Sequence, residues 1–133
     1  MKEKKKSTKP NESEMTLARM AVVASSLAFG VEAEDIISRR RDAERIVIAR
    51  QTAYWLLKVG GFMSCVKIAA ALGGRTHGTA LHGYKKIENE LELNLPRGYA
   101  QCIRDSEKYF NEFMGEHLRK EVVRKKKEFE NVI

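Results

Sequence analysis

The chain has 133 residues, of which 43% are hydrophobic, so it has the size and composition of one domain with a modest core. Its 25 lysines and arginines outnumber its 18 aspartates and glutamates and give a formal net charge of +7. This balance favours a polyanionic partner, either nucleic acid or anionic lipid. No run approaches the ~18 apolar residues of a membrane span, which argues against a membrane-spanning protein.

The first thirteen residues, MKEKKKSTKPNES, are polar and charged and include Pro10. Because they offer almost no apolar surface to bury, residues 1–13 are predicted to form a disordered basic tail. Its lysines either keep the chain soluble, which we favour, or touch a phosphate backbone loosely.

An apolar run, Met20–Phe29, follows this tail and resembles the core of a signal peptide. The run is short, two serines split it, and its apolar residues recur with helical spacing. We therefore predict a packed first helix over residues 14–29, which Gly30 ends in the C-cap position.

A short second helix is predicted over residues 32–38, with Ile36 and Ile37 as its apolar anchors. Three consecutive cations follow it: Arg39, Arg40 and Arg41. Such a run cannot belong to a core, so we expect this segment to be exposed.

The third helix is predicted over residues 47–59. Its core-facing residues recur at i, i+4, i+7 and i+8: Ala49, Ala53, Leu56 and Leu57. Arg50, Gln51 and Lys58 fall off this stripe and are expected to face water or a partner. The Gly60-Gly61 pair ends the helix.

A helix–glycine turn–helix unit comes next. Residues 64–72 form an Ala-rich fourth helix, Gly73 and Gly74 allow a tight turn, and a fifth helix begins near Thr76, a suitable N-cap. Its core-facing residues are Ala80, Tyr84, Ile87 and Leu91. Another of its faces carries Thr79, His82 and Lys86. The Leu95-Pro96 step breaks this helix.

The start of the fifth helix suits a nucleic acid. A helix N-terminus offers unpaired N–H groups and a partial positive charge to a phosphate. Four hydrogen-bond donors surround that end: Arg75, Thr76, His77 and Thr79. In a helix-turn-helix the second helix usually enters the major groove, where its first residues meet base edges, and Lys85 and Lys86 can reach the flanking backbone. The alternative is a solvated charged face with a core histidine.

The last segment, residues 97–129, is predicted to be a long helix. One side of it carries a mainly aromatic stripe: Tyr99, Ile103, Phe110, Phe113 and His117. This stripe either covers the core, which we favour, or makes a dimer. The basic run 124–127 is either a solvated helix end or an additional DNA contact. No alternating strand pattern is present, so an all-α fold is predicted.

Cys65 and Cys102 are the only cysteines, and neither belongs to a C-x-x-C pair. Both have apolar neighbours, so we expect buried, reduced thiols of a cytoplasmic protein, with a single disulfide as the alternative. His77 and His82 are five residues apart rather than at the i, i+4 spacing of a helical zinc site. We expect no metal and no cofactor.

The stretch from Gly73 to Ile87, GGRTHGTALHGYKKI, resembles the signature of the C-terminal DNA-binding domain (domain IV) of the bacterial replication initiator DnaA. That signature reads Gly-Gly-Arg-Asp-His-(Thr or Ser)-Thr and continues to a histidine. The likeness extends upstream, because the family carries a basic run, a spacer and then Arg-Gln, matched here by Arg39–Arg41 and Arg50-Gln51. It covers roughly residues 17–91, in the family's helix order.

The resemblance implies a helix-turn-helix domain of the DnaA C-terminal or Trp-repressor-like kind over residues 14–94. Residues 95–133 are then a C-terminal helical extension that the family does not explain. By this resemblance His77 and Thr79 contact bases, and Arg41 enters the adjacent minor groove. The residues assigned to phosphates are Arg50, Gln51, His82 and Lys86. The full predicted DNA-binding set is Arg39, Arg40, Arg41, Arg50, Gln51, Arg75, Thr76, His77, Gly78, Thr79, His82, Lys85 and Lys86.

Three positions depart from the family pattern. Thr76 stands where the family has a base-contacting aspartate, Gly78 replaces a base-contacting hydroxyl residue, and Ala49 replaces a proline. Each good base contact that is lost lowers discrimination by ~1–3 kcal/mol, so we expect an altered site preference.

The predicted function is sequence-preferring binding of double-stranded DNA at DnaA-box-like sites, which regulates replication initiation or transcription. The chain has no G-x-x-x-x-G-K-[ST] loop and too few residues for an ATPase module, so we expect neither ATPase activity nor another enzymatic function. The alternative is an interaction module with a weakened DNA face, whose C-terminal helix binds a replication protein. That helix could also form a homodimer. We expect the protein in the cytoplasm, associated with the nucleoid.

Overall fold

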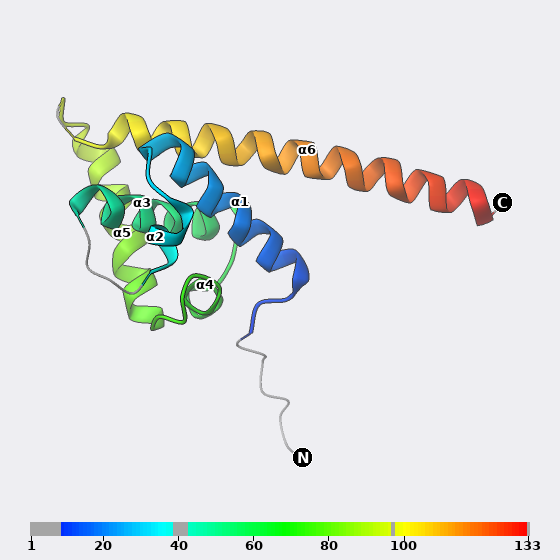
Figure 1. Cartoon of the computed structure of the whole chain (residues 1–133), viewed down its shortest axis with the longest axis horizontal. Helices are drawn as coiled ribbons and strands as arrows, with labels where there is room; N and C mark the ends of the chain where they lie inside the picture. Colours follow the sequence, from blue (N-terminus) through cyan, green and yellow to red (C-terminus); the bar gives the residue numbers. More distant parts are fainter. Residues whose placement is uncertain (1–8, 39–42, 97, 133) are drawn as a thin grey trace, which may run out of the picture.

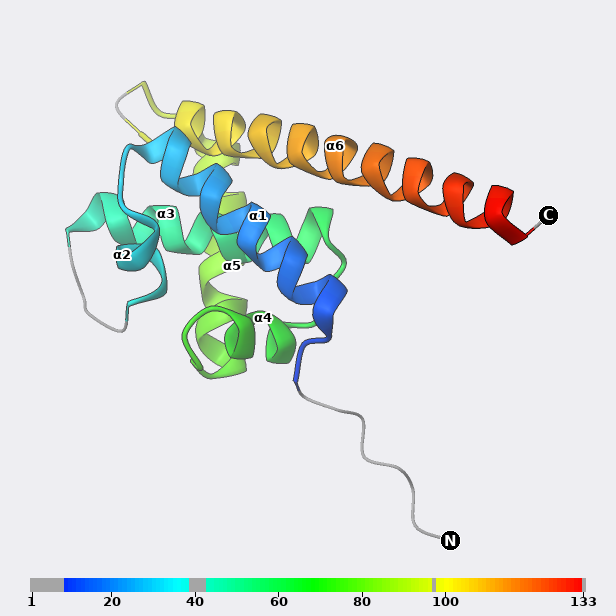
Figure 2. The same ribbon diagram turned by 45° about the vertical axis from the view of Figure 1, so that its right-hand side comes forward.

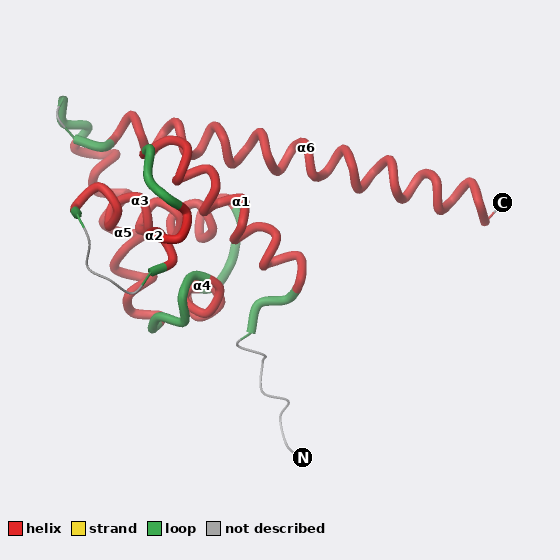
Figure 3. The backbone as a smooth tube through the Cα atoms, viewed as in Figure 1, coloured by secondary structure: helices red, strands yellow, loops and turns green. Residues whose placement is uncertain are grey.

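The computed structural model describes residues 9–38, 43–96 and 98–132. Within these ranges every regular element is helical (Figure 3), which confirms the predicted all-α fold. The elements are α1 (Glu12–Phe29), α2 (Ala33–Ile37), α3 (Glu44–Trp55), the π-helical turn η1 (Leu56–Gly60), α4 (Cys65–Ala71), α5 (His77–Leu93) and α6 (Ala100–Val132).

α1 begins two residues earlier than predicted because a capping box starts it. The side chain of Asn11 accepts from the Glu14 amide at 2.8 Å, and the Asn11 amide donates to the Glu14 carboxylate at 3.0 Å. Two N–H groups at the helix start are thereby satisfied. The predicted tail spans residues 1–13, but its last two residues, Glu12 and Ser13, belong to α1. Residues 1–8 lie outside the described part of the chain. Gly30 ends the helix with a left-handed φ of 66°, as predicted.

α1 crosses the middle of the molecule and packs against both α3 and α6 (Figure 2). Its buried side consists mainly of small residues: Ala18, Ala21, Val22, Ala24 and Ser25. Small side chains allow neighbouring helices to approach closely. At the end of α1 the Phe29 ring stacks on the Tyr99 ring, with centroids 5.9 Å apart, which joins α1 to the segment that leads into α6.

α2 has a single inward-facing anchor rather than the predicted two. Ile36 is fully buried, whereas Ile37 is 44% exposed. Consecutive residues of a helix point about 100° apart, and on the five-residue α2 this turns Ile36 toward the core and Ile37 toward its edge. The Arg39–Arg41 run that follows lies outside the described residues.

α3 begins at Glu44, three residues before the predicted start, and it carries the predicted stripe into the core. All four members of that stripe are buried: Ala49, Ala53, Leu56 and Leu57. The helix then widens into η1. A Cβ atom on Gly60 would lie 2.9 Å from the Phe110 ring, so a glycine is needed where η1 packs on α6.

α4 and α5 are the two helices of the predicted helix-turn-helix, and Thr76 is the N-cap of α5 as predicted, whereas Ser64, predicted as the first residue of the fourth helix, is the N-cap of α4. Ser64 caps α4 and Thr76 caps α5, each through a side-chain oxygen that accepts a backbone N–H. Gly73 and Gly74 make the turn with φ of 93° and 68°, which L side chains rarely adopt. α5 ends at Leu93, just before the predicted break.

α6 has two halves in different surroundings. Its first half packs along α1, where Ile103 and Phe110 are buried and Phe113 is half-buried. The predicted stripe therefore covers the core, except that His117 at its end is exposed. The second half of α6 extends away from the other helices (Figure 1).

Cys65 and Cys102 are half-buried rather than fully buried, and both are free thiols. The Cys102 Sγ lies 3.9 Å from Nη2 of Arg45. Among the described residues, no helix combines the length and apolar character required to cross a bilayer.

Candidate nucleic-acid interface

The beginning of α5 presents polar side chains to solvent. His77, the first residue of the helix, is exposed, and Thr79 and His82 on the following turns are exposed as well. The Thr76 hydroxyl accepts from the Thr79 amide at 3.4 Å and lies 3.1 Å from the Thr79 hydroxyl. These contacts order the first turn, so its side chains project from a fixed backbone.

The opposite side of α5 is fixed on α3. Ala80 and Ile87 are fully buried. A Cβ atom on Gly83 would lie 2.6 Å from a ring carbon of Tyr54 and 3.2 Å from the Gln51 side chain. The absence of a side chain at Gly83 therefore sets the distance between the two helices.

The exposed side of α5 combines the polar first turn with two cations further along. Lys85 and Lys86 are both exposed. We call the set His77, Thr79, His82, Lys85 and Lys86 the α5 face. Backbone N–H groups at a helix N-terminus and lysines a few turns away are suited to phosphate and base edges.

Arg50 does not face water or a partner, so the prediction of its orientation is wrong. Its side chain is buried, with an exposed fraction of 4%. Nε donates to the carbonyl of Ile36 at 2.7 Å, and Nη2 donates to the carbonyl of Asp35 at 2.8 Å. The last carbonyls of a helix have no partner within the helix, and Arg50 supplies one for the end of α2.

Arg75 has a comparable position at the turn before α5. Its Nη2 donates to the carbonyl of Ser38, and its backbone N–H donates to the carbonyl of Ala69 at 3.0 Å. The side chain is half-buried rather than freely extended. Beside it, a Cβ atom on Gly73 would lie 2.6 Å from the carbonyl oxygen of Ile37. The end of α2 therefore lies directly against the turn of the helix-turn-helix.

Tyr54 lies beneath these groups and has no counterpart in the predicted site. It is almost fully buried, and this burial raises the pKa of its hydroxyl, while the positive charges of Arg75 and Arg50 act in the opposite direction. Three buried polar atoms here have no hydrogen-bond partner among the described residues: Tyr54 Oη, Gln51 Oε1 and Arg75 Nε. Gln51, on α3, is half-buried, and its side chain lies beside Gly83 of α5.

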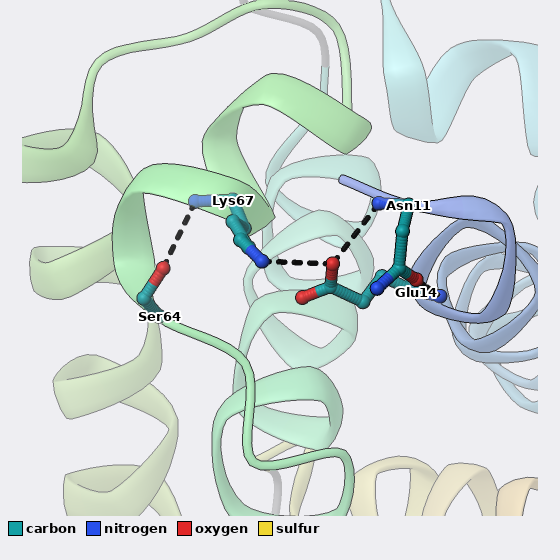
Figure 4. A network of polar contacts seen from close by, with 4 residues as sticks. All are labelled: Asn11, Glu14, Ser64 and Lys67. Carbon is teal, nitrogen blue, oxygen red and sulfur yellow. Dashed lines mark hydrogen bonds and ion pairs between the residues drawn. The ribbon is translucent and has the colours of Figure 1, made fainter. Parts of the chain in front are cut away.

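A polar network ties the first helix of the helix-turn-helix to the rest of the domain (Figure 4). The ammonium of Lys67, on α4, lies 2.9 Å from the carboxylate of Glu14, on α1. The Asn11 amide, which donates to the same carboxylate, is the main reason why the pKa of Glu14 is lowered, and Lys67 lowers this pKa further. The network positions α4, and with it the turn into α5.

The thirteen predicted DNA-binding residues therefore separate into three groups. Seven of them belong to the turn and the first three turns of α5 on its exposed or half-buried sides: Thr76, His77, Gly78, Thr79, His82, Lys85 and Lys86. Three support the end of α2 or the α3–α5 contact: Arg50, Gln51 and Arg75. The remaining three, Arg39, Arg40 and Arg41, lie outside the described residues.

Within the described ranges, no three His, Cys, Asp or Glu side chains gather as metal ligands would. Sequence reasoning missed two features of the site. The Asn11-x-x-Glu14 spacing is a capping-box signal, whereas nothing local marks Tyr54 as the residue against which Gly83 packs.

The part of the chain that contains the helix-turn-helix is similar to a known protein family. A family model described as the bacterial DnaA protein helix-turn-helix matches residues 20–87. Those residues run from within α1 through most of α5. The family is defined by a helix-turn-helix, which is a DNA-binding unit rather than a catalytic one. α6 lies outside the match.

Several curated relatives are named chromosomal replication initiator protein DnaA. The chain is 38% identical over 66 residues to the protein of Oenococcus oeni, 39% over 71 residues to that of Porphyromonas gingivalis, and 41% over 63 residues to that of Streptococcus mutans. These alignments cover 50%, 53% and 47% of this chain but only 14%, 15% and 14% of the respective relatives. The chain thus corresponds to a small part of each relative's length.

Proposed function

Because the chain belongs to the bacterial DnaA helix-turn-helix family, we propose that it binds double-stranded DNA with sequence preference, through α5. The sites are proposed to be similar to DnaA boxes, and binding is proposed to regulate replication initiation or transcription. The protein acts in this proposal without hydrolysing ATP, within the cytoplasm and in association with the nucleoid.

The observation that carries the proposal is the two-sided character of α5. One side is locked on α3 by Ala80, Gly83 and Ile87, while the α5 face is open to solvent. A major groove about 12 Å wide admits one helix presented in this way. His77 and Thr79 are proposed to contact base edges, and Lys85, Lys86 and His82 are proposed to contact phosphates.

The buried arginine changes the proposed distribution of roles. With its guanidinium on the carbonyls of α2, Arg50 is left out of the proposed phosphate contacts. Arg50 and Arg75 are instead proposed as positioning residues. They hold the end of α2, and Ser38 with it, against the turn before α5.

The experiment that tests this function measures duplex binding at several salt concentrations by fluorescence anisotropy. Each neutralised phosphate contributes about −0.9 to the slope of log K against log salt, so the two or three cations of the α5 face should give a slope of roughly −2 to −3. Lys86→Met should lower the size of that slope by about 1 for all duplexes. Lys108→Met removes an equal, exposed charge from α6 and should leave the slope unchanged. Equal behaviour of the two variants would contradict the proposal.

A further inference from the structure

The distal half of α6 exposes large apolar side chains that no other described element covers. Leu118 and Val122 are each 62% exposed, Phe129 is 65% exposed and Val132 is 83% exposed. They belong to the part of the helix that extends beyond the other helices (Figures 1 and 2). Exposed apolar residues gathered on one element are typical of interaction surfaces, so this segment is a candidate for one.

The spacing of these residues specifies the shape of that partner. Residues 118, 122, 125, 129 and 132 alternate in steps of four and three, which is the a/d pattern of a heptad repeat. Lys125 is the single polar member. The residues that pack on α1, Ile103 and Phe110, occupy a different register of the same helix. The preceding a and d positions are Gly115 and Asn111, so the apolar stripe starts where the packing on α1 ends.

Charges on the two flanks of the stripe specify the partner and its direction. In this register the e positions carry Arg119 and Lys126, and the g positions carry Glu121 and Glu128. In a parallel pair, each g residue faces the e residue of the next heptad on the other helix, so Glu121 of one copy meets Lys126 of the other. In an antiparallel pair, g faces g and e faces e, and like charges would meet.

The ion pairs within α6 already include a g-position carboxylate, because Glu121 lies 2.8 Å from Nη2 of Arg124, so Lys126 of a second helix would share Glu121 with Arg124. Arg124, Lys125 and Lys120 pair with acidic residues of their own helix. Among the described residues, Arg119 and Lys126 have no such partner, although both are exposed. The two cations at the e positions are therefore available to a second helix.

We propose that residues 118–132 of α6 form a parallel, in-register, two-stranded coiled coil with the same segment of a second copy of this chain. The helix is already formed as the continuation of α6, so pairing does not include the cost of helix nucleation. Two heptads with a lysine in the core make a weak, reversible dimer rather than a permanent one. A parallel pair places both helix-turn-helix units at the same end of the coil.

Disulfide trapping tests the direction and register of the pair. In a chain with Cys65→Ala and Cys102→Ala, Val122→Cys or Phe129→Cys should form a disulfide-linked dimer under mild oxidation. Val123→Cys is the matched control, because Val123 is 55% exposed but lies at a b position. Equal linking at position 123 would overturn the proposal. In an antiparallel pair a positions face d positions, so linking only when the Leu118→Cys and Phe129→Cys chains are mixed would show that arrangement and would also overturn the proposal.

A charge exchange tests the partner. Glu121→Lys places cations at both flanks, and Lys126→Glu places carboxylates at both. By sedimentation equilibrium each variant alone should self-associate at least about tenfold more weakly than the unmodified chain. A mixture of the two variants should recover the lost association as a heterodimer. Absence of self-association of the unmodified chain at high concentration, or no recovery in the mixture, would overturn the proposal. Neither result depends on DNA binding, so failure here is distinct from failure of the proposed function.

Discussion

The guanidinium of Arg50 donates to the carbonyl of Ile36 at 2.7 Å, fourteen residues earlier in the chain. A second hydrogen bond of 2.8 Å joins the same side chain to the carbonyl of Asp35. An arginine placed on a helix that also carries the core stripe thus closes the end of α2. Its charge stabilises the carbonyl end of a helix, where a partial negative charge gathers.

Arg50→Met is expected to destabilise the fold. The substitution keeps much of the buried apolar stem but removes the guanidinium from one buried and one partly buried carbonyl, and such losses cost about 2–4 kcal/mol in the free energy of unfolding. Urea denaturation followed by circular dichroism measures the change. In binding assays on the folded fraction, the salt slope should stay unchanged, because the proposed phosphate contacts do not include Arg50.

Lys86→Met is the counterpart of that variant. Lys86 is exposed, so its replacement should change the free energy of unfolding by less than about 0.5 kcal/mol while reducing the salt slope. An Arg50→Met chain of normal stability with a reduced salt slope would show that Arg50 contacts DNA directly.

Gly83→Ala is expected to weaken the contact between α3 and α5. The added Cβ would lie 2.6 Å from the Tyr54 ring, and overpacking of this kind costs about 1–3 kcal/mol. Gly115→Ala is the control, because a Cβ there meets nothing within 4 Å and alanine favours an α-helix over glycine by about 0.5–1 kcal/mol. Thermal unfolding should thus show a lower midpoint for the first variant and a slightly higher one for the second. A stabilising Gly83→Ala would contradict the packing described here.

Stability should decrease in acid through Glu14. The pKa of this carboxyl is lowered in the folded state, first by the Asn11 amide and then by Lys67. A lowered pKa means that the ionised form is favoured by folding, so the contribution is complete above the unfolded pKa near 4.5. It disappears as the pH falls through the lower folded value.

Glu14→Gln tests this pH dependence. The difference in urea midpoint between the unmodified chain and the variant should be largest at neutral pH and should shrink below about pH 4.5. A difference that stays constant down to pH 2 would mean that the carboxylate charge contributes nothing. Lys67→Met should retain part of the effect, because the amide of Asn11 remains in place.

Restoring two side chains of the family pattern should sharpen the choice of DNA sequence. Thr76→Asp together with Gly78→Thr supplies the side chains that the family resemblance places on bases, and a Cβ on Gly78 has room because its nearest neighbour lies 3.9 Å away. One regained base contact corresponds to at least about fivefold better discrimination. Competition binding between a DnaA-box duplex and a scrambled duplex measures this ratio.

Thr76→Asn with Gly78→Ala is the matched control for that experiment. Both substitutions keep an N-cap and a filled position 78, but they lack the carboxylate and the hydroxyl. If the control sharpened discrimination equally, the gain would come from the stability of α5 rather than from base contacts.

Much of the fold could be predicted because its signals are local. Ser64, Thr76 and Gly30 mark helix ends through their own side chains or the lack of one, and the stripe from Ala49 to Leu57 follows from spacing alone. The N-cap at Asn11 has an equally local signal in Glu14, three residues later, whereas apolar spacing alone places the start of α1 two residues late.

The roles of Arg50 and Gly83 could not be predicted because they depend on distant parts of the chain. The partner of Arg50 is the end of α2, and the neighbour of Gly83 is a ring on α3. Spacing within one helix shows which residues leave the core stripe. It does not show whether another element then covers them.

The most direct measurement is an NMR titration of the labelled chain with a duplex selected from a random library. Amide signals of residues 77–86, in α5, should show the largest shifts, and those of residues 104–112, in the first half of α6, should remain unchanged. The opposite distribution, with α5 undisturbed at saturation, would contradict the proposal that α5 enters the major groove.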